Sequence, residues 1–248
     1  PIPDVGVRLS AVSDSDVFSF AGGVAAGGDG AGLLSLTANT VVSTTHASIS
    51  DENGIESSVD AAGDVLLTAL DTSVIDSLSF GVSAAGKGAV GMAAASNVIT
   101  NRTLATIARS AVLSDSDLAL TAQLSPGIHA LAVGVSAADT AAAQVTAMGN
   151  VVVNTVAAEI QSSNVTAGRG TAGGGISLYA ADEAPSLLGL VLPAKVVGLV
   201  EAMVPADVID LDANVLAVMV SVSASGKLAA NVAAMGNVIT NTVHARIT

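Results

Sequence analysis

Polar and apolar residues alternate with a period of two near the end of the chain. From Asn237 to Ile247, one set of alternate positions holds asparagine and aliphatic residues, and the other set includes Thr242, His244 and Arg246. Successive side chains of a β-strand point to opposite faces, so this alternation predicts a strand with one buried and one solvated face. The same alternation occurs in three earlier stretches, and helical periodicity is missing almost everywhere.

The four alternating stretches belong to a repeated block of 27 residues. Each block begins with a Gly or Ser, has an Asn sixteen residues later, and ends on an Ile ten residues after the Asn. The blocks align without gaps and cover residues 23–49, 81–107, 134–160 and 221–247. Connectors of 31, 26 and 60 residues separate them, so every insertion falls outside the blocks. The block is therefore the constant unit of the fold.

One asparagine occupies the same position in every block. These residues are Asn39, Asn97, Asn150 and Asn237. If the blocks stack in register, the amides lie about 4.8 Å apart and can hydrogen-bond into a structural ladder along the stacking axis. Burying such amides without partners would be costly. The alternative is that each Asn lies in a turn that bounds a strand, where it tolerates a left-handed backbone.

The connectors contain further strand signals. Short apolar segments at 65–68, 118–121 and 176–179 follow Gly or Asp residues that are typical of turns. The third connector differs, because residues of about 185–204 favour a helix that Ser186 could cap. We expect this segment to be a helical insertion on the side of a β-scaffold.

These features predict an all-β fold, a β-solenoid of the parallel β-helix kind that forms one domain over residues 1–248. Repeated strands that cannot bury a face alone gain a core when each coil covers the preceding one. Apolar residues make up 51% of the chain and aromatic residues only 2%, so Ala, Val, Leu and Ile must build thin layers. The absence of Cys excludes disulfides, thiolate metal sites and cysteine nucleophiles.

Charge limits the partners that the chain can bind. Eight Lys and Arg residues against 21 Asp and Glu residues give a net charge of −13, which repels nucleic acid and anionic membrane surfaces. Mean hydropathy is high, at +0.68. The longest apolar stretch, residues 187–204, is nevertheless interrupted by Pro193, Lys195, Gly198 and Glu201, so we expect no membrane span.

We expect no catalytic residue and no cofactor. His46 and His244 share one outward block position while His129 lies in a connector, so the three predict surface histidines rather than a metal cluster. The segment 168–173, Gly-Arg-Gly-Thr-Ala-Gly, fits the dinucleotide-binding fingerprint literally. A strand-like sequence follows it where that motif requires a helix, so we reject the fingerprint.

Two other patterns have a functional and a simpler interpretation. The sequence Ser-Asp-Ser-Asp at 13–16 and 114–117 could contribute carboxylates to calcium, but it lacks the nonapeptide of calcium β-rolls and the spacing of an EF-hand. We therefore expect solvated turns at both places. Asn101 and Asn164 begin glycosylation-type sequons, which we interpret as chance, and Asn101 is predicted to face inward.

Particular segments connect the chain to a known class of protein. Residues 81–86 read Gly-Val-Ser-Ala-Ala-Gly, an Ala-rich strand follows, and residues 237–243 read Asn-Val-Ile-Thr-Asn-Thr-Val. In this the chain resembles the repeats of very large secreted bacterial β-solenoid proteins, the filamentous-haemagglutinin and autotransporter-like adhesins. The resemblance spans almost the entire chain and departs at the 60-residue connector. It implies an extracellular or cell-surface, elongated, non-enzymatic protein of a Gram-negative-type cell, acting as an adhesin, stalk or fibre subunit.

The phase of the repeat suggests how copies could join. Arg8 followed by 13–16 parallels Arg109 followed by 114–117, so the first residue of the chain would lie just before the end of a block. Thr248 immediately follows the end of the last block. The chain could thus continue into a further copy, within a longer polypeptide or by end-to-end stacking, which exposed sheet edges favour. The host, surface or neighbouring-cell ligand stays undefined. The alternative is a carbohydrate-binding or carbohydrate-cleaving β-helix, which needs a groove with acidic residues and aromatic platforms.

Overall fold

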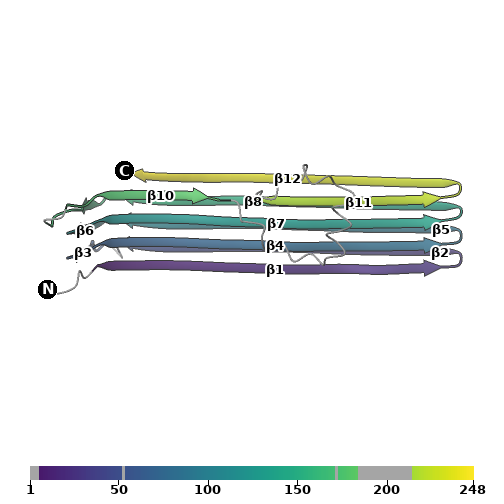
Figure 1. The fold of residues 1–248 in the computed structure, drawn as a ribbon, viewed down its shortest axis with the longest axis horizontal. Coiled ribbons are helices and arrows are strands. Elements are labelled where there is room, and N and C mark those ends of the chain that lie inside the picture. The colour runs from purple at the N-terminus through teal and green to yellow at the C-terminus, as the bar shows by residue number, and fades with distance from the viewer. Residues whose placement is uncertain (1–5, 52–53, 171–172, 184–213) are drawn as a thin grey trace.

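The chain forms a flattened β-solenoid (Figure 1). The computed structural model describes residues 6–51, 54–170, 173–183 and 214–248, and every regular element in these ranges is a β-strand. The strands are β1 (Val7–Gly27), β2 (Gly30–Ser50), β3 (Ser57–Ala61), β4 (Val65–Ala85), β5 (Gly88–Ala108), β6 (Ser110–Ser114), β7 (Leu118–Ala138), β8 (Ala141–Gln161), β9 (Asn164–Thr166), β10 (Ile176–Asp182), β11 (Val215–Ser225) and β12 (Leu228–Ile247). The prediction of an all-β solenoid is confirmed.

Each coil consists of two long strands and one short strand. In the first coil, β1 runs for 21 residues, a tight turn reverses the chain, β2 runs back for 21 residues, and the five-residue β3 closes the far end. The strands β4 to β6 and β7 to β9 repeat this path. In the next coil, β10 and β11 lie along successive parts of β7, and β12 returns beside β8 (Figure 1).

Strands of successive coils pair in parallel and form three sheets. One long sheet has the order β1-β4-β7-β10, with β11 also paired to β7. The other long sheet has the order β12-β8-β5-β2, and the short strands form the sheet β3-β6-β9. Residues of the two long sheets that face each other build the core. Side chains that alternate with them face outward, as the period of two predicts.

The backbone register reproduces the repeat in the sequence. Asn39 of β2 pairs with Asn97 of β5, which pairs with Asn150 of β8, which in turn pairs with Asn237 of β12. Each 27-residue block therefore comprises the end of a long strand, the turn, and most of the returning strand. A block is part of one coil, and the connectors supply the remainder of each coil.

The connector strands were also predicted correctly. Val65, Leu118 and Ile176 begin β4, β7 and β10 and are register partners. The helical insertion expected at about 185–204 lies outside the described residues. Among the residues that the structure does describe, none forms a helix long and apolar enough to cross a membrane.

The expected parallel between Arg8 and Arg109 is wrong. Arg8 lies in β1 and pairs with Leu66 of β4, whereas Arg109 lies at the corner between β5 and β6. Residues 13–16 are accordingly part of a strand rather than a turn, while 114–117 end β6 and lead into β7. The two Ser-Asp-Ser-Asp segments share composition but occupy different places in their coils, because a short polar segment does not specify its phase in a repeat.

Buried aliphatic side chains form three clusters: Leu78, Leu131 and Val133 lie at outward positions of β4 and β7, and the other two clusters lie between the long sheets. One cluster lies near the corners and includes Leu67, Leu118 and Ile107. The other lies near the middle of the long strands and includes Ile75 and Ile99. Rows of polar residues separate and flank these clusters, so the interior is layered along the strands. These small and branched side chains suit two sheets packed about 10 Å apart.

Tight turns join the two long sheets at the end opposite the corners. In two successive coils these turns stack closely, because the amide of Gly86 donates to the carbonyl oxygen of Gly28 at 3.1 Å. A Cβ on Gly86 would lie 2.4 Å from that oxygen, so the stacking requires glycine there. Lys87 and Asp29 add an exposed ion pair at 2.5 Å, a kind of contact that contributes about 0–1 kcal/mol.

Candidate functional site

The four block asparagines form a continuous hydrogen-bonded row through the core. The Nδ2 of Asn39 donates to the Oδ1 of Asn97 at 2.7 Å, that of Asn97 to Asn150 at 2.8 Å, and that of Asn150 to Asn237 at 2.9 Å. The partners are separated by 58, 53 and 87 residues in the sequence. All three hydrogen bonds run in the same direction, so the row has a polarity along the solenoid axis.

These asparagines lie inside strands and face inward, so the structure places them in a ladder and not in turns. Asn97 is 0% exposed and Asn150 is 1% exposed. An amide buried to this extent needs partners, and stacking identical residues supplies both a donor and an acceptor at every step. At the first coil, Asn39 also donates to the Oγ of Ser19 at 2.7 Å, which ties the ladder to the opposite sheet.

A second polar row lies deeper toward the corners. Asp71 of β4 is buried, and its Oδ2 accepts from the hydroxyls of Ser43 at 2.5 Å and Thr45 at 2.8 Å, while its Oδ1 accepts from Ser73 at 2.9 Å. Three hydroxyl donors thus take the place of water around one carboxylate. One coil further on, the equivalent position holds Leu124, so the row changes its chemistry between coils.

Several atoms of this second row have no hydrogen-bond partner among the residues that the structure describes. Both amide atoms of Asn101 and the Oγ1 of Thr103 are buried and unpaired. Asn154 donates to the Oδ2 of Asp182 at 2.9 Å, but its own Oδ1 and the Oδ1 of Asp182 are unpaired. Burial raises the pKa of Asp182 above its ordinary value, and the hydrogen bond from Asn154 opposes that shift. The row is therefore less well satisfied than the ladder.

Sequence reasoning found the ladder but did not single out the second row. Ser43, Asn101, Asn154 and Asn241 occupy one block position, so a column of polar residues was visible there. The carboxylates that meet this column lie in connectors, which have unequal lengths. Which residues face these carboxylates depends on how the two long sheets pack against each other.

A third group of buried polar residues lies near the turns, in space that two glycines leave free. Gln144 of β8 is buried, accepts from the hydroxyl of Ser136 at 2.8 Å and donates to the carbonyl of Val145 at 3.1 Å. A Cβ on Gly134 would lie 1.9 Å from the Nε2 of Gln144, and one on Gly91 would lie 2.1 Å from its Oε1. The two glycines therefore leave the space that the glutamine side chain fills.

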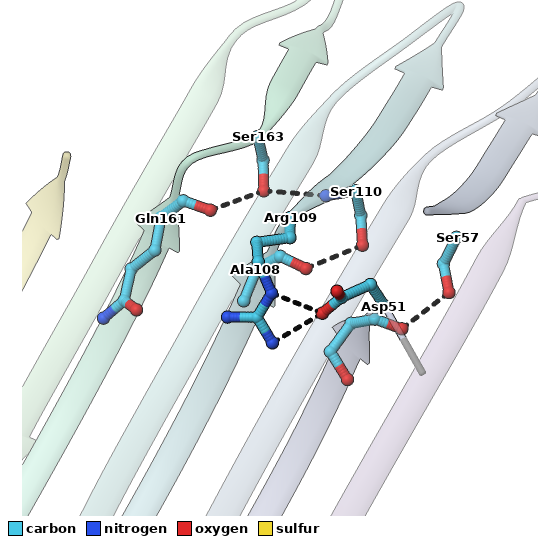
Figure 2. Close-up of polar contacts among 8 residues, drawn as sticks. Asp51, Ser57, Ala108, Arg109, Ser110, Gln161 and Ser163 are labelled. Atoms are coloured by element: carbon cyan, nitrogen blue, oxygen red, sulfur yellow. Dashed lines mark hydrogen bonds and ion pairs between the residues drawn. The ribbon is translucent and has the colours of Figure 1, made fainter. Parts of the chain in front are cut away.

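The corners between the long and short strands repeat one arrangement of serines (Figure 2). Ser110 donates to the carbonyl of Ala108 at 2.9 Å, and Ser163 of the next coil donates to that of Gln161 at 2.8 Å. Ser163 also accepts from the amide of Ser110 at 3.2 Å, which links the two corners. In the first coil Ser57 donates to the carbonyl of Ser50 at 2.6 Å across a longer loop. The serine hydroxyls thus add a second hydrogen bond to the carbonyls of Ala108 and Gln161, which also accept from the backbone amides of Asp51 and Arg109.

The same corners contain two residues with a left-handed backbone. Arg109 has a φ of 46° and Ser162, one coil further on, has a φ of 47°. The side chain of Arg109 forms an ion pair with Asp51 at 2.5 Å (Figure 2). The hydrogen bond from Arg109 lowers the pKa of Asp51 below its ordinary value. The corner therefore binds neighbouring coils through both backbone and side chains.

The three histidines lie apart, each at an outward position of its strand, and one of them is buried. His46 of β2 contacts the hydroxyl of Thr106 at 2.7 Å, and partial burial and then the charge of Arg102 lower its pKa. His244 of β12 contacts the carboxylate of Glu159. His129 of β7 is buried against Asp76 at 2.7 Å, so the expectation that it is a surface histidine is wrong. That expectation failed because the connectors differ in length, so the sequence did not show that Asp76 of the preceding coil lies beside His129.

The remaining sequence candidates lie in different places. Gly168 and Gly173 have φ values of 71° and 70° in the segment before β10, and the strand expected after the Gly-rich segment is present as β10. Asn101 is buried and faces inward, as predicted. Within the described ranges, no group of three or more His, Cys, Asp or Glu residues is placed to hold a metal ion.

Comparisons with known proteins give no match. No protein-family model, no curated protein and no solved structure matches this chain. The resemblance to adhesin repeats therefore depends on the segments quoted from the sequence. Function has to be argued from the geometry of the stack and of its surfaces.

Proposed function

We propose that the chain is an extracellular structural or adhesive protein, either a fibre subunit or a segment of a large surface adhesin. The observation that supports this proposal best is the uncovered core face of β12. Ile239 is 50% exposed and Ile247 is 63% exposed. Their register partners in β8, Val152 and Ile160, are 0% and 2% exposed. A further coil with the same pattern would bury these side chains as the other coils do.

The ladder supports continuation in one direction. Within the row, Asn237 uses its Oδ1 and Asn39 uses its Nδ2. The other atoms of these two amides, the Nδ2 of Asn237 and the Oδ1 of Asn39, match as donor and acceptor. A second copy that stacks head to tail would therefore extend the ladder with unchanged polarity. Such heterologous contacts do not close, and they produce filaments.

The construction suits a mechanical role. Neighbouring coils share parallel backbone hydrogen bonds along strands of about 21 residues, so separating two coils means breaking many bonds at once. The chain has no Cys, so hydrogen bonds and core packing hold the coils together without disulfides. The extracellular location and the adhesive role come from the resemblance to adhesin repeats.

Electron microscopy of the purified chain at several concentrations tests the proposal. We expect filaments that lengthen with concentration. Replacing Ile239 with Lys on the uncovered core face should abolish them, because a charge would be buried between copies. The matched variant Thr242→Lys, on the outer face of the same strand, should leave them intact. A wild-type chain that stays monomeric at every concentration would overturn the fibre proposal.

A further inference from the structure

One half of the outer face of the β12-β8-β5-β2 sheet carries no charge. It comprises the outward positions within residues 30–42 of β2, 88–100 of β5, 141–153 of β8 and 228–240 of β12, which we call the uncharged face. These four stretches contain no Asp, Glu, Lys, Arg or His. They are mutually in register, so their outward side chains form a continuous surface. The chain as a whole carries a net charge of −13, so this surface differs sharply from the average.

The uncharged face is apolar and open to solvent. Val42 is 72% exposed, Leu34 is 66% exposed and Leu228 is 65% exposed. Val232 and Val238 are also more than half exposed. Apolar residues make up 51% of the chain, which is more than its thin core can hold, and this surface carries part of the remainder. Exposed apolar patches of this kind mark interaction surfaces.

The extent of the face matches one side of a stable protein interface. Thirteen residues at a rise of about 3.3 Å and four strands at about 4.8 Å cover an area of about 800 Å². Each partner of a standard-size interface contributes about 800 Å². Charged residues border the patch: Lys87 and Asp29 lie at the turns, and Arg102 follows it along β5. An apolar centre with a polar rim is the usual anatomy of such interfaces.

The relief of the face is self-complementary. Leu34, Met92, Val145 and Val232 are register partners and form a ridge across the four strands. On the side away from the turns the next row is Leu36, Ala94, Ala147 and Ala234, and a shallow hollow is lined in part by Ala94, Ala147 and Gly149, with Leu36 also lining it. Gly32, Val90, Ala143 and Ala230 lie on the turn side of the ridge, and all of them except Val90 are small. A two-fold axis beside the ridge would place each ridge in the hollow of the opposite copy.

We propose that the uncharged face binds the same face of a second copy, so that two solenoids pair side by side with antiparallel strands. The two sheets would then pack mainly through apolar side chains, with the hydroxyls of Thr40, Ser96, Thr100 and Thr240 as the polar groups, and no charge would be buried. This contact is independent of end-to-end stacking, because it uses the side of the solenoid and not its last strand. Together the two contacts would give bundles of paired filaments, whereas the lateral contact alone gives dimers.

Single-cysteine variants test the lateral contact without background, since the chain has no Cys. Val145→Cys lies on the ridge near the centre of the face, where two copies would approach. We expect a short bismaleimide cross-linker to yield a covalent dimer of this variant. Val12→Cys is the matched control, because Val12 is 69% exposed on the outer face of the other long sheet. It should yield at least tenfold less dimer at the same concentration.

Sedimentation of charged variants gives a second, independent readout. Met92→Lys places a charge in the centre of the face on an outward side chain, so it should leave the fold intact by circular dichroism and weaken dimerisation at least tenfold. Val12→Lys should not weaken it. Equal cross-linking of both cysteine variants would overturn the proposal. A wild-type chain that stays unpaired, yet co-sediments with phosphatidylcholine vesicles through Met92 and Val145, would overturn it in favour of a lipid surface.

Discussion

Asn97 donates a hydrogen bond from its Nδ2 to the Oδ1 of Asn150 at 2.8 Å, although 53 residues separate the two in the sequence. Both side chains are almost completely buried. The contact requires β5 and β8 to be in register along their whole length, because a shift by one residue would turn one of the amides to the outer face. The pair therefore couples the register of the repeat to the stability of the core.

Removing the middle of the ladder should destabilise the chain. Asn97→Ala leaves the buried Oδ1 of Asn150 without a donor and removes the acceptor of Asn39. We expect the free energy of unfolding to fall by about 2–3 kcal/mol, the cost of one or two unsatisfied buried polar groups. Denaturant unfolding measures it. Asn231→Ala, at an exposed position of β12, is the control and should cost less than about 1 kcal/mol; equal losses would contradict a special role for the ladder.

Two glycines of neighbouring strands should respond oppositely to alanine. A Cβ on Gly134 would lie 1.9 Å from Gln144, within a buried hydrogen-bond network, so Gly134→Ala should cost at least about 1–3 kcal/mol through overpacking. Gly149 has no atom within 4 Å of such a Cβ. Gly149→Ala should therefore be neutral or stabilise by up to about 1 kcal/mol. Thermal unfolding of the two variants measures this difference. Equal destabilisation of both variants would contradict the claim that Gly134 leaves room for the side chain of Gln144.

Asp182 should make stability depend on pH. Burial raises its pKa in the folded chain above the ordinary value of 3.8, so the carboxylate is disfavoured in the folded state. Below 3.8 both states are protonated and nothing is lost; as the pH rises through that value the unfolded chain ionises first, and stability falls until the folded group has also ionised. Asp182→Asn should raise the melting temperature at pH 7 and leave it unchanged at pH 3. A lower melting temperature at pH 7 would show that the charge stabilises the fold.

The corner at Ser162 offers a stabilising substitution. Its φ of 47° is costly for residues with a Cβ and costs glycine nothing. Ser162→Gly should raise the free energy of unfolding by about 0.5 kcal/mol, the part of the strain that exceeds the greater entropy of glycine in the unfolded chain. Ser162→Ala keeps the Cβ and should show no gain. If both variants behave alike in denaturant unfolding, the backbone at this corner carries no strain.

The repeat was predictable from sequence because its blocks are free of insertions. Asn39 and Asn237 occupy equal positions in blocks of equal length, so their common row required only that the blocks stack. Strand type followed from the period of two, and the connector strands followed from apolar segments bounded by turn residues.

What could not be predicted is the contact between the two long sheets. Asp71 meets Ser43 and Thr45 of the neighbouring coil, and no spacing in the sequence specifies this, because the connectors differ in length. The Arg8 comparison failed for the same reason, since local similarity does not specify a position in a coil of more than fifty residues. The uncharged face was hidden for a related reason, because it appears only when the outward positions of four strands are placed in register.

Paired cysteines test the register of the stack most directly. Thr155 and Thr242 are outward register partners in β8 and β12, 87 residues apart. The chain has no cysteine of its own that could compete for an introduced pair. Neighbouring parallel strands lie about 4.8 Å apart, which suits a disulfide. The combination Thr155→Cys with Thr242→Cys should therefore oxidise to an intramolecular disulfide. Thr155→Cys with Thr240→Cys, shifted by two residues, should stay reduced. Oxidation of the shifted pair in preference to the aligned pair would contradict the stacked, in-register solenoid.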